Sequence, residues 1–233
     1  MAEMIAIVGE SGSGKTTSIR NLNPEETFII TTTGKRPGIP GAKKKYRNLN
    51  TSGKGSEELG NFYTTTSVDN VATMLQLINT KMLWVKYVII DDFQYFMAFE
   101  AMDRAREKGY EKFTEMAQHA YSVMKNAMKL RDDLYIIVST HSENMGDKIN
   151  PYYKIKTLGK MLDSVITLEG LFTYVLFTAI DKDEEGRPVY RFKTNSDGTC
   201  TAKSPMGLFD DLLIDNDLDM VVKRIKVYNG DED

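Results

Sequence analysis

The sequence contains very little cysteine and histidine: Cys200 is its single cysteine, and His119 and His141 are its two histidines. One cysteine cannot form an intrachain disulfide, and these three residues do not have the spacing of a zinc site. Such scarcity is typical of a reducing compartment, so we expect a cytosolic protein. Long apolar runs are lacking too, since none approaches the ~20 residues that span a bilayer, and the N-terminus has no signal-peptide pattern. We therefore expect no association with a membrane.

A strong charge of either sign is also lacking. The 233 residues carry 30 basic and 33 acidic side chains, which gives a formal net charge of −3. Residues 209–233 hold eight acidic and three basic side chains, so the rest of the chain is close to neutral. A near-neutral body neither requires nor excludes a polyanionic partner. Hydrophobic residues make up 41% of the chain, which excludes wholesale disorder and predicts a folded protein.

Apolar runs and amphipathic segments alternate along the first two-thirds of the chain, which predicts a mostly parallel sheet flanked by helices. The predicted strands are residues 4–8, 27–33, 85–90 and 134–139; the predicted helices are residues 16–22, a segment with Ser67 as N-cap, residues 93–106, a segment from Phe113, and residues 158–168. Residues 34–60 are predicted to be irregular. Residues 172–180, 189–194 and 199–203 are separated by turns, which predicts a β-meander. We expect an α/β domain over residues 1–209, then a helix and an acidic tail over residues 210–233.

A glycine-rich segment directly follows the first predicted strand and opens the first predicted helix. It matches the pattern G-x-x-x-x-G-K-[ST], in which backbone N–H groups wrap around phosphates. The lysine, Lys15, is predicted to reach the β- and γ-phosphates, and the hydroxyl of Thr16 is predicted to ligate Mg²⁺. The sequence therefore predicts a site for ATP and Mg²⁺ in this loop. Its residues are Gly9, Glu10, Ser11, Gly12, Ser13, Gly14, Lys15, Thr16 and Thr17.

The third predicted strand ends in two carboxylates, Asp91 and Asp92. An apolar strand with a terminal carboxylate beside a P-loop has the form of a Walker B segment, so Asp91 is predicted to hold Mg²⁺. Asp92 could orient the attacking water as a catalytic residue, or it could only cap the helix that follows. The fourth strand ends in Thr140 and His141, which are candidates for sensing the γ-phosphate or are structural hydrogen-bonding groups.

The order of these features, together with residues 113–118 of the long helix and the closing meander, resembles one family. From Met4 to about Phe209 the chain is similar to the phage RecA-like ATPases of single-strand annealing and recombination. The resemblance implies a RecA-like core in a homo-oligomer, with ATP bound between neighbouring subunits. It also implies binding to single-stranded DNA, annealing or strand exchange with a single-strand DNA-binding protein, and the host cytoplasm if the chain is phage-encoded. One departure is Lys35, which lies near the position where RecA carries its catalytic glutamate.

Residues 143–156 match the DNA-facing loop of this family by position. Basic residues beside aromatic ones suit single-stranded DNA, because bases stack on aromatic rings while lysines neutralise phosphates. The alternative is an ordinary solvated loop whose tyrosines pack on the core. The candidate DNA-binding residues are Lys148, Tyr152, Tyr153, Lys154 and Lys156. Two other basic segments, residues 104–112 and 43–47, could contact DNA or simply be solvated.

The resemblance also implies a catalytic cation supplied by the adjacent subunit. Lys203 is the preferred candidate over Lys193, and the alternative is that Lys203 is an exposed lysine of a hairpin. Two other functions fit a P-loop at the first strand. One is a nucleotide or small-molecule kinase, which usually has an arginine-rich lid that residues 34–60 match only weakly. The other is an ATPase subunit of a replication or packaging complex.

Overall fold

The computed structural model describes residues 1–50, 59–157 and 167–231. The strands are β1 (Glu3–Val8), β2 (Thr27–Thr31), β3 (Phe62–Thr64), β4 (Tyr87–Asp91), β5 (Tyr135–Thr140), β6 (Ser142–Asn144), β7 (Tyr153–Ile155), β8 (Tyr174–Lys182), β9 (Pro188–Lys193) and β10 (Leu213–Asp215). The α-helices are α1 (Ala42–Lys45), α3 (Val68–Lys81), α4 (Gln94–Asp103), α5 (Glu111–Met128) and α7 (Leu218–Asn229). The 3₁₀ helices are η1 (Thr16–Asn21) and η2 (Leu168–Leu171).

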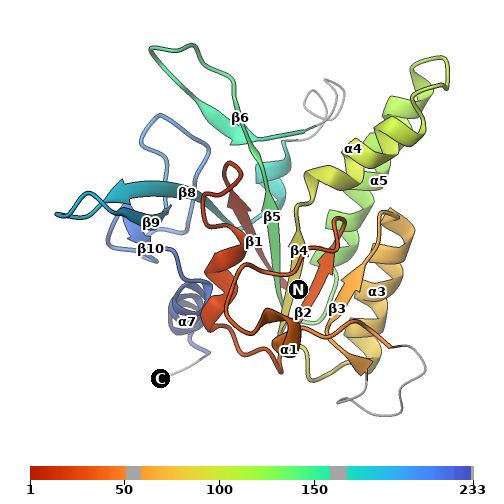
Figure 1. Ribbon diagram of the computed structural model, residues 1–233, viewed down its shortest axis with the longest axis horizontal. Coiled ribbons are helices and arrows are strands. Elements are labelled where there is room, and N and C mark those ends of the chain that lie inside the picture. The colour runs from red at the N-terminus through yellow and green to blue at the C-terminus, as the bar shows by residue number, and fades with distance from the viewer. Residues whose placement is uncertain (51–58, 158–166, 232–233) are drawn as a thin grey trace.

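Within these residues, one sheet of eight strands runs through the molecule in the order β10-β9-β8-β1-β5-β4-β2-β3 (Figure 1). The strands from β8 through β1, β5, β4 and β2 to β3 pair in parallel. Strand β9 pairs antiparallel with β8 on one side and with β10 on the other. A separate hairpin joins β6 to β7. The predicted α/β fold, with a mostly parallel sheet and an antiparallel end, is confirmed.

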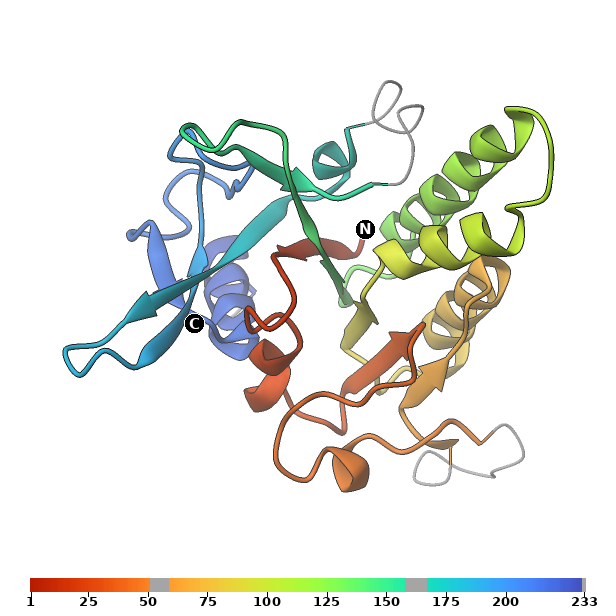
Figure 2. The same cartoon turned by 45° about the horizontal axis from the view of Figure 1, so that its top comes forward.

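Both faces of the sheet are covered, because successive residues of a strand point to opposite sides. Ala6 and Val8 of β1 join a core with Val71 of α3 and Val123 of α5. Ile5, Ile7 and their neighbours join a second core with residues of η1 and α7. Figure 2 shows α3, α4 and α5 gathered together and α7 apart from them. The continuous apolar runs of β1, β4 and β5 are explained by this burial on two sides.

The third strand of the closing meander differs from the prediction. Residues 199–203 were expected to be a strand, but they form only isolated bridges, from Cys200 to Tyr153 and from Lys203 to Val175. The edge of β9 is taken instead by β10, with Leu213 opposite Lys193. Thr194 supports that pairing, since its N–H donates to the carbonyl oxygen of Leu212 at 2.9 Å. The strand therefore comes from the segment expected to be a helix and tail.

Other local predictions have mixed outcomes. Ser67 is the N-cap of α3, and its side chain accepts a hydrogen bond from the N–H of Asn70, as expected. The helix after the glycine-rich loop is a six-residue 3₁₀ helix rather than an α-helix. Residues 34–60 include the short helix α1, and β3, which follows them, was not predicted. The helix expected over residues 158–168 falls mostly on residues 158–166, which lie outside the described part of the chain.

Candidate functional site

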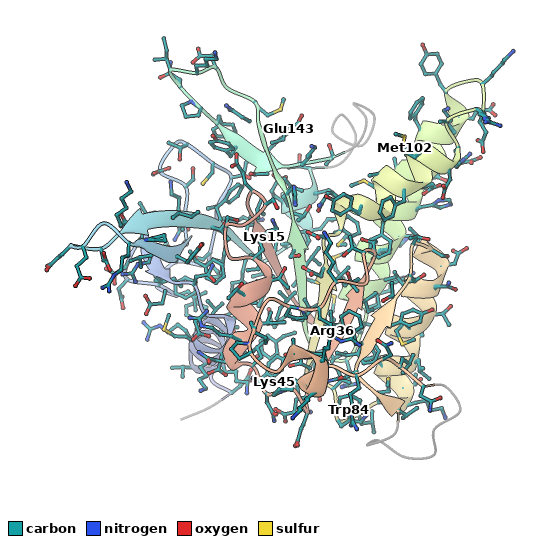
Figure 3. All side chains as sticks on the ribbon, viewed as in Figure 1. Lys15, Arg36, Lys45, Trp84, Met102 and Glu143 are labelled. Carbon is teal, nitrogen blue, oxygen red and sulfur yellow. The ribbon has the colours of Figure 1, made fainter. Side chains whose placement is uncertain are left out.

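A cleft of about 870 Å³ opens where the parallel strands end. Val8 at the end of β1 pairs with Thr140 of β5 and with Phe177 of β8, so the loop after β1 lies between these strands. Carboxyl ends of parallel strands are where ligands bind in open α/β sheets. The glycine-rich loop and η1 line the middle of the cleft, including Ser11, Lys15 and Thr17. Figure 3 shows Lys15 beside the loop that follows β1.

The loop is held against β8 by a residue that sequence analysis did not identify. Thr178 donates from Oγ1 to Ser13 Oγ at 2.6 Å, and Ser13 Oγ donates to the carbonyl oxygen of Glu10 at 2.7 Å. Gly9 lies so close to β8 that an added Cβ would be 1.7 Å from Thr178 Oγ1. Gly12 and Gly14 have positive φ values of 79° and 95°, which glycine adopts without strain. The glycines therefore serve both the turn and the close packing of the loop.

This packing predicts that Gly9→Ala is destabilising. Overpacking a close contact costs about 1–3 kcal/mol, and we expect the free energy of unfolding to fall by that amount. The double variant Gly9→Ala/Thr178→Ala should recover part of the loss, because it removes the clashing hydroxyl. Chemical denaturation measures both. Gly38→Ala is the control, since no atom lies within 4 Å of its added Cβ. Equal stability of Gly9→Ala and the unchanged protein would contradict the geometry.

Lys15 is buried, with 6% of its surface exposed, over the centre of the loop. Its ammonium group donates to the carbonyl oxygens of Gly9 at 3.0 Å and Glu10 at 2.8 Å. Burial lowers the pKa of Lys15, and the nearby carboxylates of Asp92 and Asp91 oppose that shift. A buried cation at the floor of the cleft is suited to an anionic ligand such as a polyphosphate.

Asp91 and Thr16 form a pair of oxygen donors beside Lys15. Thr16 Oγ1 donates to the two carboxylate oxygens of Asp91 at 3.2 and 3.3 Å. Ser139 Oγ donates to Asp91 Oδ1 at 2.5 Å from the neighbouring strand β5. Burial raises the pKa of Asp91, while the hydrogen bond from Ser139 opposes the rise.

These donors fit Mg²⁺. The ion prefers hard oxygen ligands and usually takes only one or two from the protein, with phosphates and water supplying the rest. In the ranges that the structure describes, no group of three or more histidine, cysteine, aspartate or glutamate side chains could hold a metal by itself. The hydroxyl of Thr16 and the carboxylate of Asp91, which are in contact, are therefore suitable as the protein ligands of such a site.

Asp92 has a strained backbone and a carboxylate that faces the cleft. Its φ is +57°, which is uncommon for a residue with a side chain, and its N–H donates to Ser139 Oγ at 2.9 Å. Strain of this kind is concentrated at functional sites. The N-cap residue of α4 is Phe93, so the alternative in which Asp92 caps that helix is not what the structure shows. Asp92 lines the same cleft as Lys15.

His141 lies beside Asp92, with 3.7 Å between His141 Nε2 and Asp92 Oδ1. Burial and the positive charge of Lys15 lower the pKa of His141, and the carboxylate of Asp92 opposes that shift. Thr140, the other sensor candidate, is not among the residues that line the cleft. It is buried, and its hydroxyl donates to Gln94 Oε1 at 3.2 Å, an oxygen that also accepts from the His141 N–H. Gln94 was not predicted, and it fixes the chain where β5 ends.

The candidate DNA-binding residues lie on the β6–β7 hairpin and just beyond it. Lys148, Tyr152 and Lys156 are exposed, whereas Lys154 is half-buried in β7 and Tyr153 packs against the core. The N–H of Lys156 donates to the carbonyl oxygen of His141 at 2.8 Å, so the hairpin closes on a residue of the cleft. The expected loop is thus a hairpin, which projects from the sheet in Figure 1.

The other two basic segments are placed differently. Arg104 forms ion pairs with Glu100, Glu107 and Glu115, and Lys112 donates to two backbone carbonyls of the same segment. These contacts favour a solvated charged connection between α4 and α5. Residues 43–47 lie around α1, and Figure 3 shows Lys45 far from Glu143 of the β6–β7 hairpin.

Lys203 is not among the described residues that line the cleft of its own chain. Its backbone pairs with Val175, in the first half of β8. Several residues of the cleft lining were not assigned a role from the sequence. They include Lys35, which follows β2, and Tyr95, whose ring lies edge-on to the His141 ring with 6.0 Å between the ring centroids. Among the described residues, no helix is long and apolar enough to cross a membrane.

The first half of the sequence matches a known protein family. The family described as an AAA domain matches residues 1–125, more than half of the chain, which include the P-loop, Asp91 and Asp92. No curated protein matches the sequence. Among solved structures, the genome packaging NTPase B204 from Sulfolobus turreted icosahedral virus 2, in complex with ATP-gammaS, matches with 13% identity and a TM-score of 0.40. That match covers 79% of this chain and 78% of the other. The chain belongs to the AAA domain family and is a P-loop ATPase.

Proposed function

We propose that this ATPase is a RecA-like recombination protein that binds single-stranded DNA and promotes its annealing or strand exchange. The observation that carries the proposal is that the β6–β7 hairpin begins and closes beside the nucleotide cleft. The hairpin begins directly after His141, which lines the nucleotide cleft, and it closes through the Lys156 N–H on the His141 carbonyl. A change at the cleft can therefore alter the position of the exposed residues Lys148 and Tyr152.

The residues of the cleft have distinct roles in this proposal. Lys15 binds the β- and γ-phosphates, and Thr16 and Asp91 hold Mg²⁺. Bound Mg²⁺ supplies neutralisation of the phosphate charge. Asp92 accepts a hydrogen bond from the attacking water and orients it toward the γ-phosphate. His141 lies next to Asp92 in the same cleft, so it can respond to the presence of the γ-phosphate.

Hydrogen bonds within the hairpin hold its shape. Asn144 Oδ1 accepts from the N–H groups of Gly146 at 2.9 Å and Tyr152 at 3.0 Å. Asp147 Oδ1 accepts from the N–H groups of Ile149 and Asn150, both at 2.7 Å. A preorganised loop loses less conformational entropy on binding. Lys148 and Tyr152 thus present a charge and a ring on a defined support.

DNA binding can be tested on the hairpin directly. We expect Lys148→Ala/Lys156→Ala to weaken binding of a fluorescent oligonucleotide and to lower the salt slope by roughly 0.7 per lysine. Tyr152→Ala should cost about 1–3 kcal/mol, because a stacked base is lost. Fluorescence anisotropy with Mg²⁺ and a non-hydrolysable ATP analogue measures each variant.

Lys223→Ala on α7 is the matched control, because Lys223 is exposed and lies outside the hairpin. Absence of oligonucleotide binding at low salt would refute the proposed function. Phosphoryl transfer to nucleosides or nucleotides by the same preparation would identify a kinase instead.

We also propose a homo-oligomer that binds ATP between its subunits and acts with a single-strand DNA-binding protein. Lys203 supports the first part, since it is half-buried and away from the cleft of its own chain. If a neighbouring copy presents Lys203 to the γ-phosphate, its positive charge would stabilise the negative charge that develops on the phosphoryl group during hydrolysis. Size measurement with and without ATP and single-stranded DNA tests this assembly.

A further inference from the structure

The cleft has a second wall, to which the proposed hydrolysis assigns no role. The loop after β1 separates two groups of strands in the sheet. On one side are Asp91, Asp92 and His141, from β4 and β5. On the other side are residues that follow or belong to β9 and β10, among them Tyr190 and Asn216. A triphosphate whose γ-phosphate faces Asp91 must therefore direct its nucleoside toward β9 and β10.

Asn216 is the most unusual residue of this second wall. It is only 3% exposed, yet its side-chain Nδ2 has no hydrogen-bond partner within the described residues. Its backbone is fixed on both sides, because its N–H donates to the carbonyl oxygen of Tyr190 at 3.3 Å and its carbonyl oxygen accepts from the Arg20 guanidinium. A buried amide without a partner is unfavourable, and such a group in a cleft is suited to a ligand.

The amide of Asn216 lies directly against the P-loop. A Cβ built on Gly14 would be 3.3 Å from both Nδ2 and Oδ1 of Asn216, and 3.1 Å from Cδ1 of the Tyr190 ring. Both side chains thus meet the loop at the glycine that precedes Lys15. A nucleotide with its phosphates on the loop passes this point as its sugar and base leave the phosphate site.

Tyr190 supplies a different kind of contact. Its side chain is 42% exposed and lines the cleft beside Pro188 and Val189. Aromatic rings bind nucleobases by stacking, with little preference among bases, because every base has a π-face. Selectivity must therefore come from a group that forms hydrogen bonds, and the carboxamide of Asn216 offers one donor and one acceptor.

We propose that Tyr190 and Asn216 form a base subsite that prefers adenine to guanine. An asparagine amide can donate to N7 of adenine and accept from its 6-amino group, whereas guanine presents two acceptors at the same edge. The subsite rests on the proposed triphosphate binding by the P-loop, and it adds the residues that select the base. Tyr190 contributes affinity for either purine, and Asn216 contributes the discrimination.

The test compares three ligands on the full chain by calorimetry in Mg²⁺: ATP, GTP and inorganic tripolyphosphate. We expect ATP to bind more tightly than GTP and tripolyphosphate. The near-isosteric variant Asn216→Leu should weaken ATP by about 10-fold and reduce the preference over GTP, with tripolyphosphate unchanged. Tyr190→Leu should weaken ATP and GTP equally, and Tyr190→Phe should retain both, because it keeps the ring.

The outcomes separate the subsite from the phosphate site. Tripolyphosphate binding that equals ATP binding, or a loss in Asn216→Leu that is the same for all three ligands, would overturn the subsite and leave the phosphate site intact. Failure of all three ligands to bind would overturn the triphosphate site and the subsite together. If Asn216→Leu does not fold, Asn216→Ser replaces it, and an unchanged ratio of ATP to GTP affinity in that variant overturns the proposal.

Discussion

Replacing Lys15 with alanine is expected to lower ATP turnover by about 100- to 1,000-fold, the usual cost of removing one group that stabilises charge in a transition state. The ammonium group is the cation at the floor of the cleft, and it lies within 3.0 Å of the carbonyl oxygens of Gly9 and Glu10. Without it, the phosphate oxygens would face these carbonyls and the carboxylate of Asp91. Nucleotide affinity should fall as well, because the attraction for the phosphates is lost.

The fold should survive this substitution. Burial lowers the pKa of Lys15, which means that the folded chain bears a desolvation cost for the charged group. Alanine removes that cost, so we expect little change in thermal stability. Phosphate release, binding of a fluorescent ATP analogue and thermal unfolding measure the three effects. Lys182→Ala, at the exposed end of β8, is the control. Full turnover in Lys15→Ala would refute the assignment of the P-loop.

The parts of the site that could be predicted from sequence are local. The glycine-rich loop has its glycines, lysine and threonine within eight consecutive positions. The central strands β1, β4 and β5 are continuous apolar runs. A strand that is buried on both faces leaves such a run, and a carboxylate at its end is conspicuous. The mostly parallel sheet and the places of Lys15, Thr16 and Asp91 follow from these patterns.

The remaining contacts of the site connect distant positions. Thr178 and Ser13 are 165 positions apart, Ser139 and Asp91 are 48 apart, and Gln94 and Thr140 are 46 apart. They meet because β8, β1, β5 and β4 are neighbours in the sheet, an order that no local pattern specifies. Serine, threonine and glutamine in apolar surroundings give no signal of the partner that will satisfy them.

The edge of the sheet was mispredicted for a related reason. β10 has only three residues, too few for an alternating pattern, whereas residues 199–203 resemble a strand in composition. The strand that forms is β10. The hydroxyl of Thr194, just after β9, donates to the carbonyl oxygens of Asp211 and Leu212, which directly precede β10. This choice places Asn216, one residue beyond β10, against the P-loop, and that position could not be inferred from sequence.

Asp92→Asn is expected to lower ATP turnover by about 100-fold with little change in nucleotide affinity, since a general base typically contributes at least that factor. Asparagine keeps the size of the side chain and, like aspartate, tolerates a positive φ, so the backbone at +57° should be preserved. It removes the negative charge that orients and accepts a proton from water. The loss should therefore appear in the rate of hydrolysis rather than in binding.

Asp92→Gly distinguishes chemistry from backbone strain. Glycine adopts a positive φ freely, so this variant relieves the strain at Asp92 while it also removes the carboxylate. If the carboxylate performs the chemistry, Asp92→Gly and Asp92→Asn are both slow, although glycine leaves the backbone unstrained. Single-turnover hydrolysis of saturating ATP compares them at equal nucleotide occupancy. Normal turnover in Asp92→Asn would show that another group activates the water. In that case the strained residue serves only to join β4 to α4.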